Sequence, residues 1–316
     1  MSEPVTCGIL LAIAKPLGCT SHDVVGRVRR ALHTRRVGHA GTLDPDASGV
    51  LVVGVGPATR LMGLLTLDDK SYSARIQLGS ATTTDDAAGE VIATGEVPAW
   101  CFDEREAAAR VAELEGEIDQ VPPQFSAISV GGRRAYDRAR AGEDVALEPR
   151  HVRIYEARLA GVSRVCDDSG REVPAWDVDI RVSKGFYVRS LARDLGRDIG
   201  CHAHVSALER TASGDIALGS CVTLDELADG GWDAALAHAL DPVSALGCAS
   251  VVVDQATAGD VLNGKTARLT CALEAAGIMG GRVAVTCDGM VVGVWDVASG
   301  RPSCVANFPQ GIRGVR

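Results

Sequence analysis

Residues 34–49 read Thr-Arg-Arg-Val-Gly-His-Ala-Gly-Thr-Leu-Asp-Pro-Asp-Ala-Ser-Gly and separate two segments with a clear hydrophobic pattern. Before them, Ser21-His-Asp23 is followed by apolar residues at helical spacing up to Leu32, which predicts a capped helix. After them, residues 50–55 form an apolar run that is typical of a buried strand. The stretch itself has no periodicity and carries three glycines and a proline, so we expect a structured loop of unusual length. Loops of this kind often carry functional residues.

Outward from this stretch, the chain mixes predicted helices and strands. A helix is expected from Pro57 to Leu65, and a half-buried strand over residues 70–79. Further helices are expected near 103–115, 133–141 and 187–199, and further strands near 125–130, 150–162, 174–183 and 203–210. Because strands and helices do not alternate strictly, we predict an α+β fold with a mixed, largely antiparallel central sheet flanked by helices and loops.

The last part of the chain has a different character. From about residue 246 the apolar runs are short and are expected as strands, at 250–253, 282–286, 291–296 and 304–308. This pattern predicts a small C-terminal β-rich domain. We therefore expect a first domain over residues 1–245 and a second domain over residues 246–316.

The composition is that of an ordinary soluble protein, with 316 residues of which 46% are hydrophobic and 23% are charged. No apolar stretch approaches the roughly 20 residues that span a bilayer. The N-terminus also lacks the features of a signal peptide, so a cytoplasmic protein is expected. The ten cysteines include no Cys-x-x-Cys pair and are expected as free thiols. Cys201-His-Ala-His204 is only a weak zinc signal, and we predict no metal site.

The charges are unevenly distributed along the chain. The formal net charge is −9, but the excess acid lies in residues 85–119 and 223–260, which leaves the remainder net basic. Basic residues gather in three clusters, within residues 27–36, 133–140 and 184–197. One such cluster is commonly a solvated helix face, whereas three on an acidic chain favour a polynucleotide partner.

One phosphate-binding pattern competes with this interpretation. Residues 259–266, Gly-Asp-Val-Leu-Asn-Gly-Lys-Thr, match the G-x-x-x-x-G-K-[ST] pattern of a P-loop. A P-loop needs a strand before it and a helix after it, whereas residues 256–262 are predicted to be helical, with Asn263-Gly264 as the C-cap. A nucleotide hydrolase remains an alternative, which predicts that ATP raises the melting temperature and that Lys265→Ala abolishes the rise.

Asp44 lies in the long loop, in the sequence Gly38-His-Ala-Gly-Thr-Leu-Asp-Pro45. A lone aspartate before proline in a glycine-rich loop is commonly a turn residue, and other motifs must decide its role. Seven motifs in order resemble the TruB family of tRNA pseudouridine synthases: residues 15–21 (Lys-Pro-Leu-Gly-Cys-Thr-Ser), 36–45, 48–51, 69–72, 121–127, 132–136 and 183–189. The resemblance runs from about residue 8 to 212, and the tail from about 246 is similar to the small RNA-binding PUA-type domain of such enzymes.

The resemblance implies a pseudouridine synthase fold and an isomerase that acts on uridine 55 in the T loop of tRNA. Such enzymes detach the uracil, rotate it and reattach it through carbon 5, without cofactor or metal. Asp44 is then the catalytic residue, either as nucleophile at C1′ or as the base that takes the C2′ proton. Arg189 matches the arginine whose charge keeps this carboxylate ionised.

The resemblance also implies residues that handle the flipped base. Tyr72 is expected to stack on it, Tyr187 and Leu208 to line its pocket, and His39 to fill the gap that it leaves. Ala88 departs from the family, which often has a second acid at this position.

The expected partner is the T stem-loop of tRNA, with no membrane, no obligate protein partner and a monomeric state. Contacts to the RNA backbone are expected from the basic residues Lys15, Arg35, Arg36, Arg133, Arg134 and Lys184. A tRNA-folding chaperone in which catalysis is secondary remains the alternative function.

Overall fold

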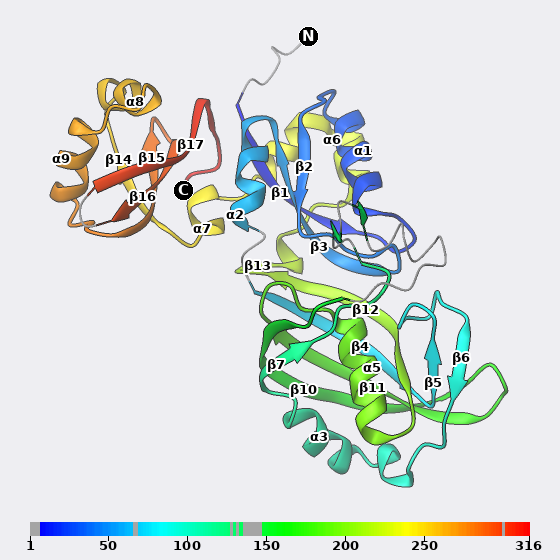
Figure 1. Cartoon of the computed structure of the whole chain (residues 1–316). Coiled ribbons are helices and arrows are strands. Elements are labelled where there is room, and N and C mark those ends of the chain that lie inside the picture. Colours follow the sequence, from blue (N-terminus) through cyan, green and yellow to red (C-terminus); the bar gives the residue numbers. More distant parts are fainter. Residues whose placement is uncertain (1–6, 66–68, 127–128, 131–132, 135–146, 299–300) are drawn as a thin grey trace. The chain divides into compact units, whose positions relative to one another are not determined.

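A computed structural model describes residues 7–65, 69–126, 129–130, 133–134, 147–298 and 301–316. The chain forms two compact units, one of Met1–Leu67 with Ala212–Arg316 and one of Asp68–Thr211, and each is described by itself (Figure 1). The predicted domain boundary at 245/246 falls inside the first unit and stays a prediction.

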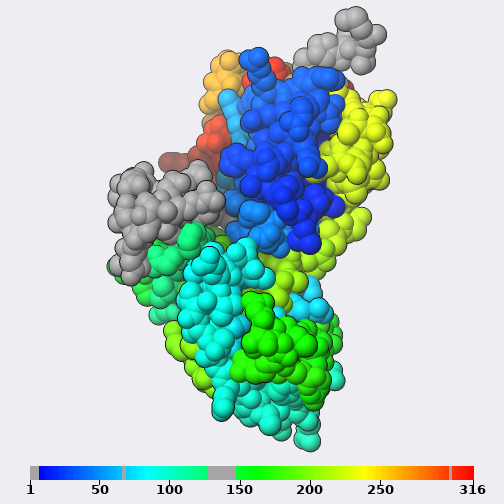
Figure 2. All heavy atoms as spheres, turned by 90° about the vertical axis from the view of Figure 1, so that its right-hand side faces the viewer, coloured from blue at the N-terminus to red at the C-terminus, as the bar shows by residue number. Residues whose placement is uncertain are grey.

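The first unit is built on β3 (Ala47–Val55), which lies between two partners. β1 (Ile9–Lys15) pairs antiparallel with it from Ile9↔Val55 to Lys15↔Gly49, and β2 (Val37–Ala40) pairs antiparallel with Val52–Val55. Both flanking helices, α1 (Ser21–Ala31) and α6 (Leu224–Ala237), share a buried apolar core with β1 and β3. Figure 2 shows α1 in blue beside α6 in yellow. Helix α6 was not predicted.

Three local predictions in this unit need correction. The long loop of residues 34–49 is shorter, because Val37–Ala40 forms β2 against β3 and β3 already begins at Ala47. The N-cap of α1 is Thr20, not Ser21: the Thr20 hydroxyl accepts from the Asp23 amide at 3.0 Å, and the Asp23 carboxylate accepts from the Thr20 amide at 2.9 Å. The helix predicted from Pro57 begins as a 3₁₀ turn, Gly56–Leu61, and continues as α2 (Met62–Leu65).

The C-terminal part of the first unit forms a four-stranded sheet, which confirms the predicted small β-rich domain. Its strand order follows the chain: β14 (Ala249–Val252), β15 (Gly281–Cys287), β16 (Met290–Ala298) and β17 (Arg301–Ile312). The first pair is parallel and the others are antiparallel. Short elements lead into this sheet: β13 (Ile216–Ala217), a 3₁₀ turn at Leu218–Ser220 and α7 (Pro242–Ala245).

The P-loop pattern falls on a helix beside this sheet. α8 (Gln255–Leu262) contains the first glycine of the pattern and is followed by α9 (Ala267–Ala275), which was not predicted. Gly264 lies just beyond the end of α8 with a φ of +75°, as expected for a helix C-terminus. The amides of residues 259–262 are therefore used within a helix, and no phosphate-binding loop is formed there.

The second unit is built on an antiparallel sheet. Its strands lie in the order β12 (Ala203–Ser213), β4 (Lys70–Leu78), β11 (Glu172–Val182), β10 (Arg150–Cys166) and β7 (Gly116–Gln120). The register of β4 with β11 places Tyr72 opposite Ile180. These pairings confirm the predicted largely antiparallel sheet of an α+β fold.

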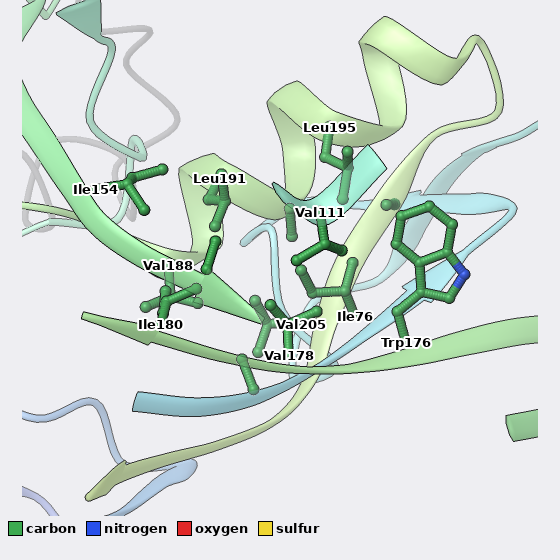
Figure 3. Packing of buried hydrophobic residues seen from close by; sticks show 14 of the residues in the cluster. Ile76, Val111, Ile154, Trp176, Val178, Ile180, Val188, Leu191, Leu195 and Val205 are labelled. Atoms are coloured by element: carbon green, nitrogen blue, oxygen red, sulfur yellow. The ribbon is translucent and has the colours of Figure 1, made fainter. Parts of the chain in front are cut away.

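Helix α5 (Val188–Ile199) covers the core of this sheet, as Figure 3 shows for Leu191 and Leu195 above Ile180 and Val178. It ends at Gly200 with a φ of +84°, as the sequence predicts. Helix α3 (Glu104–Ala112) joins the same core, which β7 also borders. The smaller elements are β5 (Ser80–Thr82), β6 (Val91–Thr94) and a 3₁₀ turn at Ala99–Phe102.

Two further predictions concern residues 125–141. Of the expected strand over 125–130, residues 125–126 are not strand and Ser129–Val130 form β8, while residues 127–128 lie outside the described residues. The expected helix over 133–141 begins instead as a strand, β9 (Arg133–Arg134), which pairs with β8. Residues 135–141 lie outside the described residues.

Candidate active site

Asp44 lies in the turn between β2 and β3. Its carbonyl accepts from the Ala47 amide at 3.1 Å, and its side chain is half-buried. Gly41 enters the turn with a φ of +74°, a conformation that favours glycine. The carboxylate is therefore carried by a short backbone turn of defined shape.

Residues 15–21 hold this turn in place. The Ser21 hydroxyl accepts from the Leu43 amide at 2.9 Å and donates to the Leu43 carbonyl at 3.1 Å. The Gly18 amide donates to the Pro45 carbonyl at 2.9 Å. Two motifs that are separate in the sequence thus form one hydrogen-bonded structure, in which Asp44 lies between two clamped neighbours.

Lys15 completes this clamp. Its side chain is 1% exposed, and its ammonium donates to the carbonyls of Pro16 at 2.9 Å, Pro45 at 3.3 Å and Ala47 at 2.6 Å. A lysine so deeply buried has no surface on which to meet a phosphate. The structure therefore favours a structural role for Lys15 over the predicted contact to the RNA backbone.

His39 lies in β2, two residues before Gly41, where the turn begins. Its ring meets the ring of His22 edge to face, with centroids 5.5 Å apart and an interplanar angle of 82°. His39 is half-buried and His22, on the first turn of α1, is exposed. The strand that carries His39 leads directly into the Asp44 turn.

The basic residues that precede β2 are exposed. Arg35 and Arg36 both face solvent, and the Arg36 Nε donates to the Thr59 hydroxyl at 3.2 Å. On α1, Arg27, Arg29 and Arg30 are also exposed, and Arg29 donates to the Val37 carbonyl at 3.0 Å. This face of the first unit is positively charged, as the first basic cluster predicts.

Arg189 is a buried cation of the second unit. It lies in the first turn of α5 and is 6% exposed. Its guanidinium donates to the carbonyls of Thr84 and Phe125, each at 3.1 Å, and lies 3.6 Å from an oxygen of Asp86. A buried charge requires such partners, and here they come from two different loops.

Asp86 lies two residues before Ala88, the position at which the sequence departs from the family. The sequence has alanine where the family often has a second acid, and Asp86, two residues earlier, provides a carboxylate beside Arg189. Asp86 is itself oriented by the Ala88 amide at 3.1 Å and the Thr84 hydroxyl at 2.5 Å.

Tyr187 occupies the N-cap position of α5, and Gln120 fixes its backbone. The Gln120 side chain accepts from the Tyr187 amide at 2.8 Å and donates to its carbonyl at 3.1 Å. Gln120 is 1% exposed and was not predicted as a site residue. A polar residue at the end of a strand gives no signal in the sequence that it is buried.

Tyr72 and Leu208 are the other predicted base contacts. Both are half-buried at the border of the core of the second unit, on β4 and β12. Lys184 is exposed, beside Gly185 with a φ of +80° in the turn before α5. The side chains of Arg133 and Arg134 lie outside the described residues.

The third basic cluster is divided: Arg189 is buried and Arg193 half-buried, whereas Lys184 and Arg197 are exposed, which the sequence did not indicate. Arg193 donates to Asp85 Oδ2 at 3.1 Å and to the Val121 carbonyl at 2.8 Å. Arg197 lies 3.3 Å from Asp194. Burial raises the pKa of Asp85, and the charges of Arg193 and Arg189 act in the opposite direction. Of this cluster, Arg189 and Arg193 serve to brace loops against α5.

The described part of the chain holds no cluster of three or more His, Cys, Asp or Glu that could bind a metal ion. In the zinc-like pattern at 201–204, Cys201 and His204 are buried, His202 is exposed, and His204 Nδ1 lies 3.2 Å from the Ser80 carbonyl oxygen. Among the described helices, none is both long and apolar enough to cross a membrane.

The predicted site residues thus fall into two half-sites. The first unit carries Asp44, His39, Arg35 and Arg36, with Lys15 and Ser21 holding the turn of Asp44. The second unit carries Arg189, Tyr187, Tyr72, Leu208 and Lys184, with Gln120 and Asp86 holding the first two. Asp44 in the first half-site is half-buried, and Arg189 in the second is buried.

Comparison with known proteins identifies the family. The TruB family pseudouridylate synthase N-terminal domain matches residues 29–188, and the tRNA pseudouridylate synthase B C-terminal domain matches residues 189–246. A tRNA pseudouridine synthase B from Thermobifida fusca is 55% identical over 221 residues, which are 69% of this chain and 74% of the relative. A protein of the same name from Mycobacteroides abscessus is 46% identical over 292 residues, 92% of this chain and 93% of the relative.

Solved structures support the fold. The crystal structure of a Cbf5-Nop10-Gar1 complex has a TM-score of 0.66 at 23% identity, covering 98% of this chain and 85% of that chain. An archaeal box H/ACA sRNP Nop10-Cbf5 complex has a TM-score of 0.61 at 24% identity, covering 93% and 79%. The fold and the matches over nearly the whole length lead to one conclusion: this chain belongs to the TruB family of pseudouridylate synthases and is an isomerase.

Proposed function

We propose that the chain converts uridine 55 in the T loop of tRNA to pseudouridine, with Asp44 as the catalytic residue. The names of its relatives support tRNA as the substrate. The observation that carries the proposal is the Asp44 turn, in which Ser21 and Lys15 fix the backbone on both sides while the carboxylate stays half-buried. A catalytic carboxylate requires this combination of fixed position and access to substrate.

In the proposed reaction the glycosidic bond of uridine breaks, the uracil turns, and a bond from C1′ to carbon 5 replaces the bond to nitrogen 1. Asp44 either forms a transient bond to C1′ as the uracil leaves or removes the C2′ proton and later returns it. Either route leaves the carboxylate unchanged, and the proton on carbon 5 is lost as nitrogen 1 gains one. Both routes need an ionised Asp44, and Arg189 is proposed to favour that form in the complex with RNA.

The uridine must leave its stack before it reacts, at a cost of a few kcal/mol. We assign Tyr72 to stacking on the flipped base, which contributes about 1–3 kcal/mol. Tyr187 and Leu208 would line the base pocket, and His39 would take the vacated space. All four residues are half-buried, which supports the assignment. The buried part of each residue packs against the protein, and the exposed part is accessible to a nucleobase.

For the RNA backbone we propose Arg35, Arg36 and Lys184, which are exposed, together with Arg133 and Arg134. Lys15 is left out of this set because it is buried. The four-stranded sheet within residues 246–316 is proposed as a separate PUA-like RNA-binding domain, and the enzyme as a monomer.

The test is single-turnover pseudouridine formation on an unmodified T-stem-loop RNA, mapped with a pseudouridine-specific chemical readout. Wild type, Asp44→Asn and Asp46→Asn are compared, because Asp46 is an exposed aspartate on the same turn. We expect product at the T-loop uridine with wild type and Asp46→Asn, and none with Asp44→Asn. Tight RNA binding without product from wild type would contradict the proposal and favour the tRNA-folding chaperone.

A further inference from the structure

The second unit contains a hollow that uses none of the proposed site residues. It has a volume of about 420 Å³, within the range of small-molecule sites. Its walls come from β4, β5, β6, β12 and the turn after β10. Figure 2 faces this side of the unit, with the green residues of that turn beside the cyan residues of the β5–β6 hairpin.

His204 is a buried polar residue that lines this hollow, beside the buried hydroxyl residues Ser80 and Thr82. It is 5% exposed, and its Nδ1 lies 3.2 Å from the Ser80 carbonyl oxygen and 3.4 Å from the Ser80 hydroxyl. Because a carbonyl oxygen only accepts, Nδ1 must carry the proton in this contact. In the neutral ring Nε2 is then an acceptor, and it is the nitrogen that remains for a ligand in the hollow.

Gln77 provides the second polar group. It lies on β4 between Ile76 and Leu78, which both point into the core, so its side chain is on the opposite face, where it lines the hollow. A glutamine amide presents one donor and one acceptor side by side. This pair matches the adjacent amino group and ring nitrogen of adenine.

The remaining walls restrict the chemistry of the ligand. Ala87 and Val91 are apolar, and Asp168 adds an exposed carboxylate at the turn after β10. Among the described residues that line the hollow there is no lysine or arginine. A phosphate is therefore disfavoured, whereas an uncharged ring that donates hydrogen bonds is favoured.

We propose that this hollow binds an adenine base, with Gln77 paired to its amino group and ring nitrogen and the second amino hydrogen donated to His204 Nε2. The adenine can belong to a free nucleoside or to an unpaired residue of an RNA. The loop of residues 82–89 forms one wall, and the same loop carries Thr84 and Asp86, which hold Arg189. The site is thus separate from the proposed active site and is joined to it by one loop.

The test is isothermal titration calorimetry of the full chain with adenosine, inosine and cytidine. Inosine has a carbonyl oxygen in place of the amino group, so we expect it to bind at least about tenfold more weakly than adenosine. Oligoadenylate distinguishes the two sources of the adenine. If it binds more tightly than adenosine, the ligand is an RNA residue, and if it binds more weakly, the ligand is a free nucleoside. Asp44→Asn should bind adenosine like wild type, so the result does not depend on the proposed reaction.

Two variants address the two contacts. Gln77→Glu removes the donor, and His204→Asn keeps a donor near the Nδ1 position while it removes Nε2. Each should weaken adenosine binding at least about tenfold, whereas the matched change Gln255→Glu on α8 should have no effect. If His204→Asn lowers the melting temperature markedly, its loss of binding can come from a damaged fold, and adenosine binding by Gln77→Glu then decides the test. No saturable adenosine binding at millimolar concentration, equal binding of inosine or cytidine, or wild-type binding by Gln77→Glu would overturn the proposal.

Discussion

The two half-sites position their ionisable groups in different ways. In the first unit the hydrogen bonds go to the backbone around Asp44: Ser21 holds Leu43, and Lys15 holds Pro45 and Ala47. In the second unit they go directly to the functional side chain, because two loop carbonyls and Asp86 receive the Arg189 guanidinium.

This difference follows from the size of the side chains. Aspartate has one carbon beyond Cβ, so a fixed backbone nearly fixes its carboxylate, which can remain accessible. Arginine has a long flexible chain, and only contacts at its end define its position. The comparison predicts that damage to the first half-site acts through the backbone, whereas damage to the second acts on the charge itself.

The largest effect is expected from Arg189→Met. It removes a buried cation and leaves the carbonyls of Thr84 and Phe125 without this donor, so the free energy of unfolding should fall by about 3–5 kcal/mol. Pseudouridine formation should slow by about 10²–10³-fold, because a preorganised charge is lost. Urea denaturation and single-turnover kinetics measure the two effects.

The matched control is Arg197→Met on the same helix, since the Arg197 side chain is 71% exposed. Its free energy of unfolding should change by less than about 0.5 kcal/mol. Equal losses in the two variants would show that Arg189 is not the buried anchor of its half-site.

The next effect is expected from Lys15→Met, which keeps the length of the buried side chain but removes three hydrogen bonds to carbonyls. An unsatisfied buried acceptor costs about 1–3 kcal/mol, so the free energy of unfolding should fall by at least this amount. Lys265→Met, at a lysine whose side chain is 70% exposed, is the control and should be nearly neutral. If Lys15 instead contacted phosphate, Lys15→Met would weaken RNA binding and leave stability unchanged.

The sequence predicted most of the fold, because the hydrophobic periods of β4, α3 and α5 are local properties. The predictions were wrong where the structure of a segment depends on its pairing with a strand elsewhere in the sequence. Residues 37–40 read as loop because three of the four are small or polar, and only the partner strand β3 makes them a strand. Thr20 was missed as the cap of α1 because Ser21 is an equally good capping residue, and here Ser21 binds Leu43 instead.

The resemblance proposes the site residues, which stay predictions, but it does not indicate which residues support them. The motifs point to Asp44 and Arg189. For Lys15 the sequence predicts a contact to phosphate, because it shows the charge of a lysine but not its burial. Gln120 and Arg193 were missed as supports because their partners, Tyr187 and Asp85, are 67 and 108 residues away.

A smaller effect tests whether the Asp44 turn is held by Ser21 itself or by the start of α1. Ser21→Ala removes both hydrogen bonds to Leu43, whereas Thr20→Ala removes only the cap of the helix. Each variant should lose about 1–2 kcal/mol of stability. The single-turnover rate should fall with Ser21→Ala and stay near wild type with Thr20→Ala. Equal rates in the two variants would mean that the turn does not depend on the Ser21 hydroxyl.

The smallest effect contrasts two aspartates with opposite pKa shifts, one in each unit. Hydrogen bonds from Thr20 lower the pKa of Asp23 from its ordinary value of 3.8, whereas burial raises the pKa of Asp85 from the same value. A group whose pKa is lower in the folded state stabilises the fold at pH values above its pKa in the unfolded state. This stabilisation is lost as pH falls through its pKa in the folded state. A group whose pKa is higher in the folded state stabilises the fold at pH values below its pKa in the unfolded state. This stabilisation is lost as pH rises through its pKa in the folded state.

The two aspartates should therefore respond oppositely to pH when each is replaced by asparagine. The melting temperature of wild type minus that of Asp23→Asn should grow as pH rises through the range below 3.8, because only ionised Asp23 accepts strongly from Thr20. The same difference for Asp85→Asn should shrink as pH rises above 3.8, because wild type must then bury a charge that asparagine lacks. Taking differences at each pH cancels the titration of all other groups. Parallel curves would show that the buried ion pair of Asp85 with Arg193 outweighs its loss of solvation, and the distinction between the two units would then not extend to their charges.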